Sequence, residues 1–359
     1  MSYDTDSRFG AGFCRVSVLV LFFAAGAVRL SLAVSLPETA VTKIIVIPLP
    51  SRTKEIRLLR FFPTEKDEAQ GVFFSRAQDI SLDPQGRIYV TDVKANQVLV
   101  FDAEGRFIRK IGGPGQGPGE FDMAGRALWT SSGLAVLDRS NSRVQYFDDR
   151  GWFSKSLKLT KSYIEMAIGT DGTIFAFNMR GGPGGMIDAI DADGRAHTSY
   201  GNPPQALSDG ASPRVCWLSM SPRDELFVAY WFSPVVQVYS AAGELRSVFE
   251  IQYKPMQDKL ARNPANSKTT AGGARVIGQS IIEAIWATGE GFFVLHRDSA
   301  GRIDILEFSR AGTFVRDYWS AQSPEYYPRG LVIRENAGKK VFYLPQTVPE
   351  NRVDIFIEK

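Results

Sequence analysis

Short runs in which apolar and polar residues alternate recur along the chain from residue 75 to the carboxyl end. Each unit contains an apolar strand, a turn with Gly or Asp, a second apolar strand, a polar loop, a third strand, a Gly turn and a fourth strand. Alternation of this kind between turn residues is typical of β-strands. The clearest units span 79–112, 127–159, 166–201, 217–251 and 283–319. The pattern therefore predicts an all-β chain of repeated four-stranded units.

A glycine precedes the fourth strand of each of these five units. Successive glycines are 46, 43, 49 and 69 residues apart, at Gly105, Gly151, Gly194, Gly243 and Gly312. A period of about 40–50 residues with four strands per unit is typical of a β-propeller, in which antiparallel blades surround an axis. The long last interval contains an insertion at 252–280. Its segment KPMQDKLARN predicts a short helix.

A sixth unit begins at Gly330 and ends after its third strand, RVDIFIEK. A propeller must close its ring or leave a strand edge exposed. Two amino-terminal segments, 43–49 and 55–62, have strand-like patterns and could supply the missing fourth strand. We therefore expect an all-β fold, a six-bladed β-propeller of four-stranded antiparallel blades, with the ring closed by an amino-terminal strand.

The amino-terminal segment has the features of an export signal. Residues 16–28 form a largely apolar run without a charged residue, preceded by Arg8 and Arg15 and followed by small residues. This run of 13 residues is shorter than the ~20 that a membrane-spanning helix needs. A signal peptide is predicted, with an uncleaved anchor as the alternative. It indicates a periplasmic or extracellular protein without a membrane span in the mature chain. The predicted division is 1–33 signal peptide, 34–74 amino-terminal segment with the ring-closing strand, and 75–359 propeller.

Composition excludes several classes of function. Lys plus Arg number 42 and Asp plus Glu number 39 in 359 residues, so a net charge of +3 gives no footprint for nucleic acid. After removal of the signal peptide only Cys216 remains, which excludes an internal disulfide and is typical of a small buried side chain.

Motifs for metal or nucleophilic catalysis are missing from the sequence. The only histidines are His197 and His296, and no HxH, HExxH, CxxC or GxSxG occurs. The Gly-rich run 112–119 precedes a strand and lacks the Lys-Ser or Lys-Thr of a phosphate loop, so a mobile connector between blades is expected. No catalytic residue, metal ligand or cofactor is therefore predicted.

The link between the second and third strands is the most specific feature. VTDVKANQVLVFD at 90–102, VLDRSNSRVQYFD at 136–148 and the loop GGPGQGPGEF at 112–121 resemble the NHL-repeat family, six-bladed propellers that include exported bacterial proteins. The resemblance implies that an Asp after the second strand and an Arg opening the third tie the loop to the blade. The matching residues here are Asp92, Asp138, Arg143, Arg302 and Arg352. Some related propellers are lyases or lactonases with an axial metal or catalytic pocket, but no such set of residues matches here.

Binding on one loop-rich face is the expected function. Propeller topology puts the insertion, the connectors between blades and the loops after second strands on the same face, and long loops on a rigid scaffold commonly carry binding sites. The insertion is rich in Lys and Arg. This composition suits either a clamp for an acidic or polymeric partner or a solvated linker. We expect a non-catalytic platform for a protein, peptide or glycan of the cell envelope. The alternative is a lyase or hydrolase with calcium or zinc at the channel mouth. The candidate binding residues are Asp92, Asp138, Asn178, Tyr230, His296 and Arg297.

Overall fold

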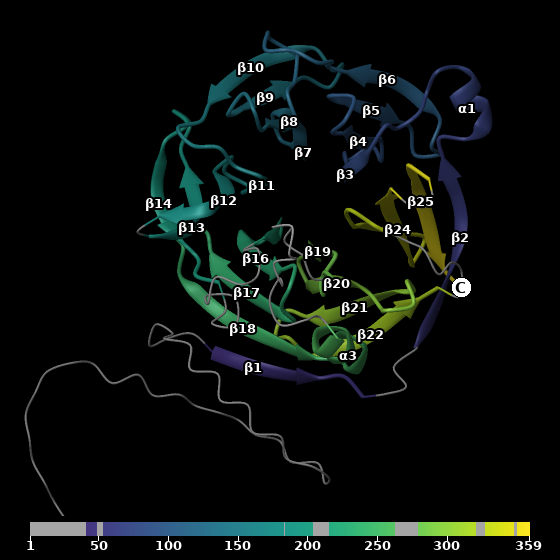
Figure 1. Cartoon of the computed structure of the whole chain (residues 1–359), viewed down its shortest axis with the longest axis vertical. Helices are drawn as coiled ribbons and strands as arrows, with labels where there is room; N and C mark the ends of the chain where they lie inside the picture. Colours follow the sequence, from purple (N-terminus) through teal and green to yellow (C-terminus); the bar gives the residue numbers. More distant parts are fainter. Residues whose placement is uncertain are drawn as a thin grey trace, which may run out of the picture.

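Six four-stranded antiparallel units surround a central axis in the computed structural model (Figure 1). It describes residues 41–48, 53–182, 184–203, 215–262, 279–320, 327–347 and 350–359, so the predicted signal peptide lies outside the described residues. We number the blades 1 to 6 in the order of their first strands. This arrangement confirms the predicted fold class.

Each blade runs from an inner first strand to an outer fourth strand. Blades 1 to 3 contain β3 (Ala77–Leu82), β4 (Ile88–Asp92), β5 (Gln97–Phe101) and β6 (Phe107–Ile111); β7 (Ala124–Thr130), β8 (Gly133–Asp138), β9 (Arg143–Phe147) and β10 (Phe153–Lys158); β11 (Glu165–Ile168), β12 (Ile174–Gly182), β13 (Gly185–Ile190) and β14 (Ala196–Tyr200). Blades 4 to 6 contain β15 (Cys216–Met220), β16 (Glu225–Tyr230), β17 (Val235–Ser240) and β18 (Leu245–Gln252); β19 (Ala284–Ala287), β20 (Gly291–Arg297), β21 (Ile303–Ser309) and β22 (Phe314–Trp319); β23 (Val332–Asn336), β24 (Lys339–Gln346), β25 (Arg352–Glu358) and β2 (Lys54–Phe62).

The amino-terminal strand β2 closes the ring, as predicted. It pairs antiparallel with β25, from Ile56 opposite Glu358 to Phe62 opposite Val353. Its first residues also pair in parallel with β22, which joins blades 5 and 6 into one eight-stranded sheet. The other candidate segment has a different role, because β1 (Val41–Val46) adds a parallel fifth strand outside β18 of blade 4.

The middle strands are buried on both sides because neighbouring blades pack face to face. Every residue of β4 and β8 is buried, whereas the outer strands β6 and β10 are largely exposed. The glycines of the outer hairpins permit this packing. Gly105 has φ +81°, and a Cβ there would lie 2.8 Å from the Phe62 ring of blade 6. Gly243 has φ +86°, and its Cβ would lie 2.6 Å from the Tyr200 ring of blade 3. Only glycine satisfies both conditions.

The predicted helix in the insertion is present as α3 (Lys254–Arg262), and a shorter helix, α1 (Glu65–Ala69), follows β2. Met256 of α3 is fully buried in the apolar core between blades 4 and 5. Lys259 is also buried, and its Nζ donates to the backbone oxygen of Arg297 at the end of β20, 2.6 Å away. The described part of the insertion is therefore packed against the propeller. We call the end of the ring that carries α3 and the loops after second strands the α3 face.

Candidate functional site

The two predicted aspartates hold loops in place on the α3 face. Asp92 is buried at the end of β4, where its carboxylate accepts hydrogen bonds from the backbone N–H groups of Ser75 (2.6 Å) and Arg76 (2.9 Å). Asp138 is buried at the end of β8 and accepts from the Asp122 N–H, 2.8 Å away. Each carboxylate thus holds the segment that leads into the first strand of its own blade.

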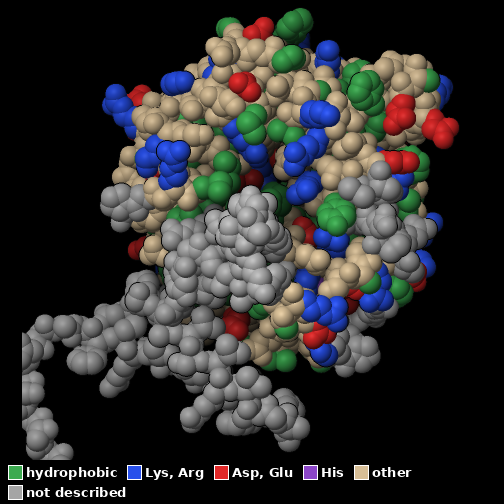
Figure 2. All heavy atoms as spheres, viewed as in Figure 1, with side chains coloured by type: hydrophobic (Ala, Val, Ile, Leu, Met, Phe, Trp, Pro, Cys, Tyr) green, Lys and Arg blue, Asp and Glu red, His purple; other side chains and the backbone are tan. Residues whose placement is uncertain are grey.

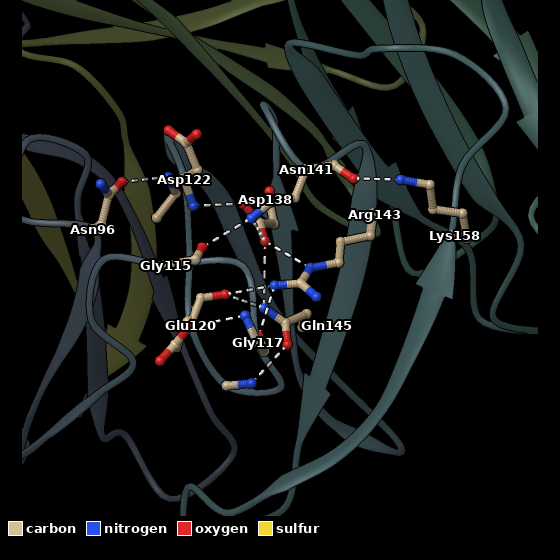
Figure 3. A network of polar contacts seen from close by, with 12 residues as sticks. Asn96, Gly115, Gly117, Glu120, Asp122, Asp138, Asn141, Arg143, Gln145 and Lys158 are labelled. Carbon is tan, nitrogen blue, oxygen red and sulfur yellow. Dashed lines mark hydrogen bonds and ion pairs between the residues drawn. The ribbon is translucent and has the colours of Figure 1, made fainter.

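Asp138 also anchors the Gly-rich connector between blades 1 and 2 (Figure 3). Arg143 Nε lies 2.8 Å from the Asp138 carboxylate, and its Nη2 donates to the backbone oxygens of Gly117 and Glu120. Gln145 holds the same loop through the Gly119 N–H, which donates to its Oε1 at 2.8 Å. The run at 112–119 is a connector between blades, as predicted. The expected mobility is wrong, because these side-chain contacts fix the loop.

Two further predicted residues, Tyr230 and His296, are buried within blades, and Asn178 is half-buried and makes a local turn contact. Asn178 accepts a hydrogen bond from the Arg180 N–H (2.9 Å), and the buried Tyr230 hydroxyl donates to Gln237 Oε1 (2.7 Å). His296 is fully buried, with Nδ1 2.8 Å from the Ile281 carbonyl oxygen. Burial lowers the pKa of His296 to about 3, so the ring is neutral and Nδ1 carries the proton that faces the carbonyl. Of the six predicted residues, Arg297 takes part in the axial network described next.

The first strands of blades 1 to 3 carry a buried ionic triad at the axis. Arg126 of β7 lies between two carboxylates: its Nη1 is 2.6 Å from Glu165 Oε1, and its Nε is 3.6 Å from Asp79 Oδ2. All three residues are less than a tenth exposed. Burial raises the pKa of Glu165 to about 7 although Arg126 opposes this shift, and burial also raises the pKa of Asp79.

A second ionic group lies across the axis in blade 5. Glu283, immediately before β19, lies 3.5 Å from Arg297 Nε and 3.7 Å from Lys259 Nζ. Burial lowers the pKa of Lys259 to about 8, with Glu283 opposing and Arg297 reinforcing the shift. Arg297 also lies over the Tyr327 ring, with its guanidinium carbon 4.0 Å from the ring centroid. The Glu283 carboxylate therefore pairs with two cations, Arg297 and Lys259.

Two arginines near the axis have no side-chain partner among the described residues. Arg139 follows β8, Arg329 precedes β23, and the Nε of each is buried without a hydrogen bond. Burial lowers the pKa of both groups, and the charge of Arg76, which lies just before β3, lowers each further. Arg76 thus acts electrostatically on both neighbours, from blade 1 toward blades 2 and 6.

These residues make the axial opening on the α3 face cationic. We call the opening the axial mouth. In the described part of the chain, three acidic side chains, Asp79, Glu165 and Glu283, face six cationic ones, Arg76, Arg126, Arg139, Lys259, Arg297 and Arg329. The nearby Asp298 is occupied by Arg302, 2.7 Å away. Figure 2 shows a hollow near the centre of the ring, with Lys and Arg side chains gathered around it and acidic ones inside.

Sequence reasoning missed most of the axial mouth. Of the residues that it selected at the ends of second strands, only Arg297 belongs to the mouth; in blade 2 it selected Asp138, and the cation stands one position later, at Arg139. Because adjacent residues of an extended chain point in opposite directions, a side chain held in the blade is followed by one directed away from it. The available signal for Arg139 was its position directly after Asp138, which matches that of Arg297 directly after His296.

A separate cavity of about 740 Å³ lies at the turns between first and second strands, the opposite end from the loops just described. Its walls combine apolar side chains with hydroxyl groups, contributed by residues such as Trp129, Tyr146, Ile168, Thr170 and Met220. It shares none of its lining residues with the axial mouth, so binding at the two ends can be tested separately.

Three further observations concern metal binding, membrane-spanning helices and thiol chemistry in the described residues. No group of three or more His, Cys, Asp or Glu among them could hold a metal ion. Within the same ranges, no helix has the length and apolar character needed to cross a membrane. Cys216 is buried, and burial raises the pKa of its thiol well above the usual value, which keeps it protonated.

Comparisons with known proteins agree with a six-bladed propeller. A family described as a six-bladed β-propeller matches residues 74–182. An exported protein of Bacteroides fragilis, so described in its structure, shares 12% identity at a TM-score of 0.56 over 88% of this chain and 99% of its own. A streptogramin B lyase shares 15% identity at a TM-score of 0.53, covering 85% and 98%. An inactive virginiamycin B lyase from Staphylococcus aureus with quinupristin shares 14% at 0.50, covering 84% and 88%. At these identities the likeness concerns the fold alone.

Replacing Glu165 with glutamine is expected to flatten the pH dependence of stability. Because the native pKa is about 7 and the unfolded value near 4.5, the native state holds a proton that the unfolded chain has lost between these pH values. The wild type therefore loses stability from this group as pH rises from 5 to 7.5, by at most about 1.4 kcal/mol per pH unit. Urea unfolding at several pH values measures the slope. An unchanged slope in Glu165→Gln contradicts the assignment.

Proposed function

We propose that the protein is an exported, non-catalytic binding platform, and that it takes an acidic group of a protein, peptide or glycan at the axial mouth. The excess of cationic over acidic side chains around the mouth carries this proposal. A guanidinium without a protein partner costs stability in a folded chain, and an external anion supplies the missing partner. The resemblance to NHL-repeat propellers and the fold shared with an exported protein support a role outside the cytoplasm.

A lyase-like reaction has less support from these residues. General acid–base work requires a titratable side chain within reach of a substrate. His296 is enclosed in blade 5 with its Nδ1 bound to a carbonyl oxygen, and His197 lies exposed on the outer strand β14. The titratable Glu165 and Lys259 of the axial mouth are buried and already bonded, to Arg126 and to the backbone oxygen of Arg297. The guanidinium groups of the mouth bind and orient oxyanions.

Binding of acidic polymers to residues 34–359 tests the platform. The probes are oligogalacturonate as an acidic glycan, polyglutamate as an acidic peptide and dextran as a neutral control, titrated by calorimetry at low and high salt. We expect at least one acidic probe to bind, with affinity falling as salt rises, and dextran not to bind. Absence of binding by both acidic probes overturns the proposal.

Hydrogen exchange with the bound probe locates the site. Protection is expected in segments that carry the mouth, 74–77, 138–141 and 296–299, and not in the 130–133 and 169–172 turns around the opposite cavity. Protection confined to those turns would place binding at the other end of the ring and contradict the proposal.

A further inference from the structure

We propose that the axial mouth binds a ligand that presents two oxyanion groups, one at Arg76 and Arg139 and the other at Arg297 and Arg329. This inference rests on the proposed function and specifies the number and the seats of the acidic groups. The four arginines come from blades 1, 2, 5 and 6, which are consecutive around the ring because blade 6 adjoins blade 1. They therefore span an arc of about half the ring, from blade 5 to blade 2 on the opposite side of the axis.

The first seat is built into the backbone of blade 2. Arg139 crosses over Gly125 of β7, where a Cβ would lie 2.5 Å from Arg139 Nε. The absence of a side chain at Gly125 gives the guanidinium its path beside Arg126. Arg139 acts electrostatically on Asp79 and Glu165, but neither carboxylate makes a hydrogen bond to it; Arg126 makes the close contact with each. Arg139 thus retains its hydrogen-bonding capacity.

The second seat lies at the junction of blades 5 and 6. Arg329 is fixed at its backbone, where its N–H donates to the Pro345 oxygen at 2.8 Å. Its side chain interacts electrostatically with Glu283, Arg76 and Arg297, and its buried Nε has no hydrogen-bond partner in the described chain. Glu283 already serves Arg297 and Lys259, so it supplies too little negative charge for Arg329 as well.

Charge balance favours two groups over one. The mouth has three more cations than acids in the part of the chain that the structure describes, so a single monovalent anion leaves most of the excess in place. The guanidinium is planar and binds carboxylate or phosphate oxygens in pairs, which suits either kind of oxyanion. A ligand with two such groups neutralises both ends of the arc and relieves the repulsion that Arg76 exerts on its neighbours.

Small anions of increasing valence test the number of groups. Acetate, succinate and citrate are titrated into residues 34–359 at constant ionic strength, with inorganic phosphate and pyrophosphate as the phosphate arm. We expect succinate to bind at least tenfold more tightly than acetate, or pyrophosphate at least tenfold more tightly than phosphate. The arm with the larger gain identifies the oxyanion. Equal affinity for the mono- and divalent members of both arms overturns the two-group proposal.

Variants test the two seats separately. Arg139→Gln and Arg329→Gln are each expected to weaken the divalent anion at least tenfold, and neither removes an ion pair. Gly125→Ala keeps every charge and displaces Arg139 by steric overlap, so it should weaken the same anion. Lys110→Gln on the outer strand β6 makes the same charge change away from the axis and should have no effect. Wild-type affinity in both Arg variants refutes the seats.

The failures of the two proposals are distinguishable. If an acidic polymer binds the wild type but the anion series shows no valence effect, the platform stands and the two-group ligand is wrong. If no acidic polymer binds, the proposed function fails. Circular dichroism and thermal unfolding of each variant verify that its fold is intact, because loss of binding counts only in a folded protein.

Discussion

Replacing Arg126 with methionine is expected to lower the free energy of unfolding by about 3–5 kcal/mol at pH 8, the range measured when one partner of a buried ion pair is removed. Arg126 is the only residue within 4 Å of the Asp79 and Glu165 carboxylates that carries a positive charge in the described part of the chain. Methionine fills similar space but leaves two buried carboxylates without a cation in contact, since Arg139 acts on them only as a more distant charge. The cost of desolvating them is then uncompensated.

The same substitution should cost less at low pH. Removal of Arg126 takes away the interaction that opposes the rise in both carboxyl pKa values, so both acids bind protons more readily in the native variant. Below pH 6 the neutral acids carry a smaller desolvation cost. Denaturant unfolding at pH 8 and pH 5.5 measures both losses, with Arg126→Lys as a variant that keeps the charge. A loss of the same size at both pH values would show that lost packing, not charge, is responsible.

Loss of the ring-closing strand should have the second large effect. Ile56 of β2 is buried against blades 5 and 6, whereas Leu59 of the same strand is 40% exposed. Ile56→Asp introduces a charge into the apolar core and is expected to lower the free energy of unfolding by about 4 kcal/mol or more. Leu59→Asp makes a similar chemical change at the surface and should cost less than about 1 kcal/mol.

Truncation tests the same strand without changing a side chain. A chain that begins at residue 53 lacks β1 but retains β2, and a chain that begins at residue 63 lacks both. We expect the first to remain folded with reduced stability, because Ile45 and Ile47 are lost from the core of blades 4 and 5. The second should aggregate, since β25 then presents an unpaired edge. Equal behaviour of the two chains contradicts the role assigned to β2.

The fold was predictable because its evidence is repeated. Four strands per period and a glycine before each fourth strand recur in five units, so errors in one unit do not change the interpretation. The choice between 43–49 and 55–62 was not predictable, because both segments alternate and both form strands. What distinguishes them is their partner: β1 lies parallel to β18, and β2 lies antiparallel to β25. Strand pairing between distant segments leaves no local pattern.

The axial mouth was harder to predict from the sequence than the fold, because its charged residues occur one at a time within apolar strands. Asp79, Arg126 and Glu165 each stand alone in a first strand, and only the ring brings them within contact distance. Resemblance to a family correctly indicated that Asp138 and Arg143 tie a loop to its blade. That structural role explains why the end of a second strand was a weak guide to ligand contacts.

Both ends of the polypeptide contribute to blade 6, which has a consequence for how the ring assembles. β2 precedes its partner β25 in the sequence, and Ile56 lies opposite Glu358 across 302 residues. Contacts so distant in sequence form slowly. Ile56 and Phe62 of β2 therefore stay exposed to solvent or to other chains until β25 has been synthesised. Blade 6 is therefore the last blade to form, and the segment that contains β2 is the one that most needs protection against aggregation before then.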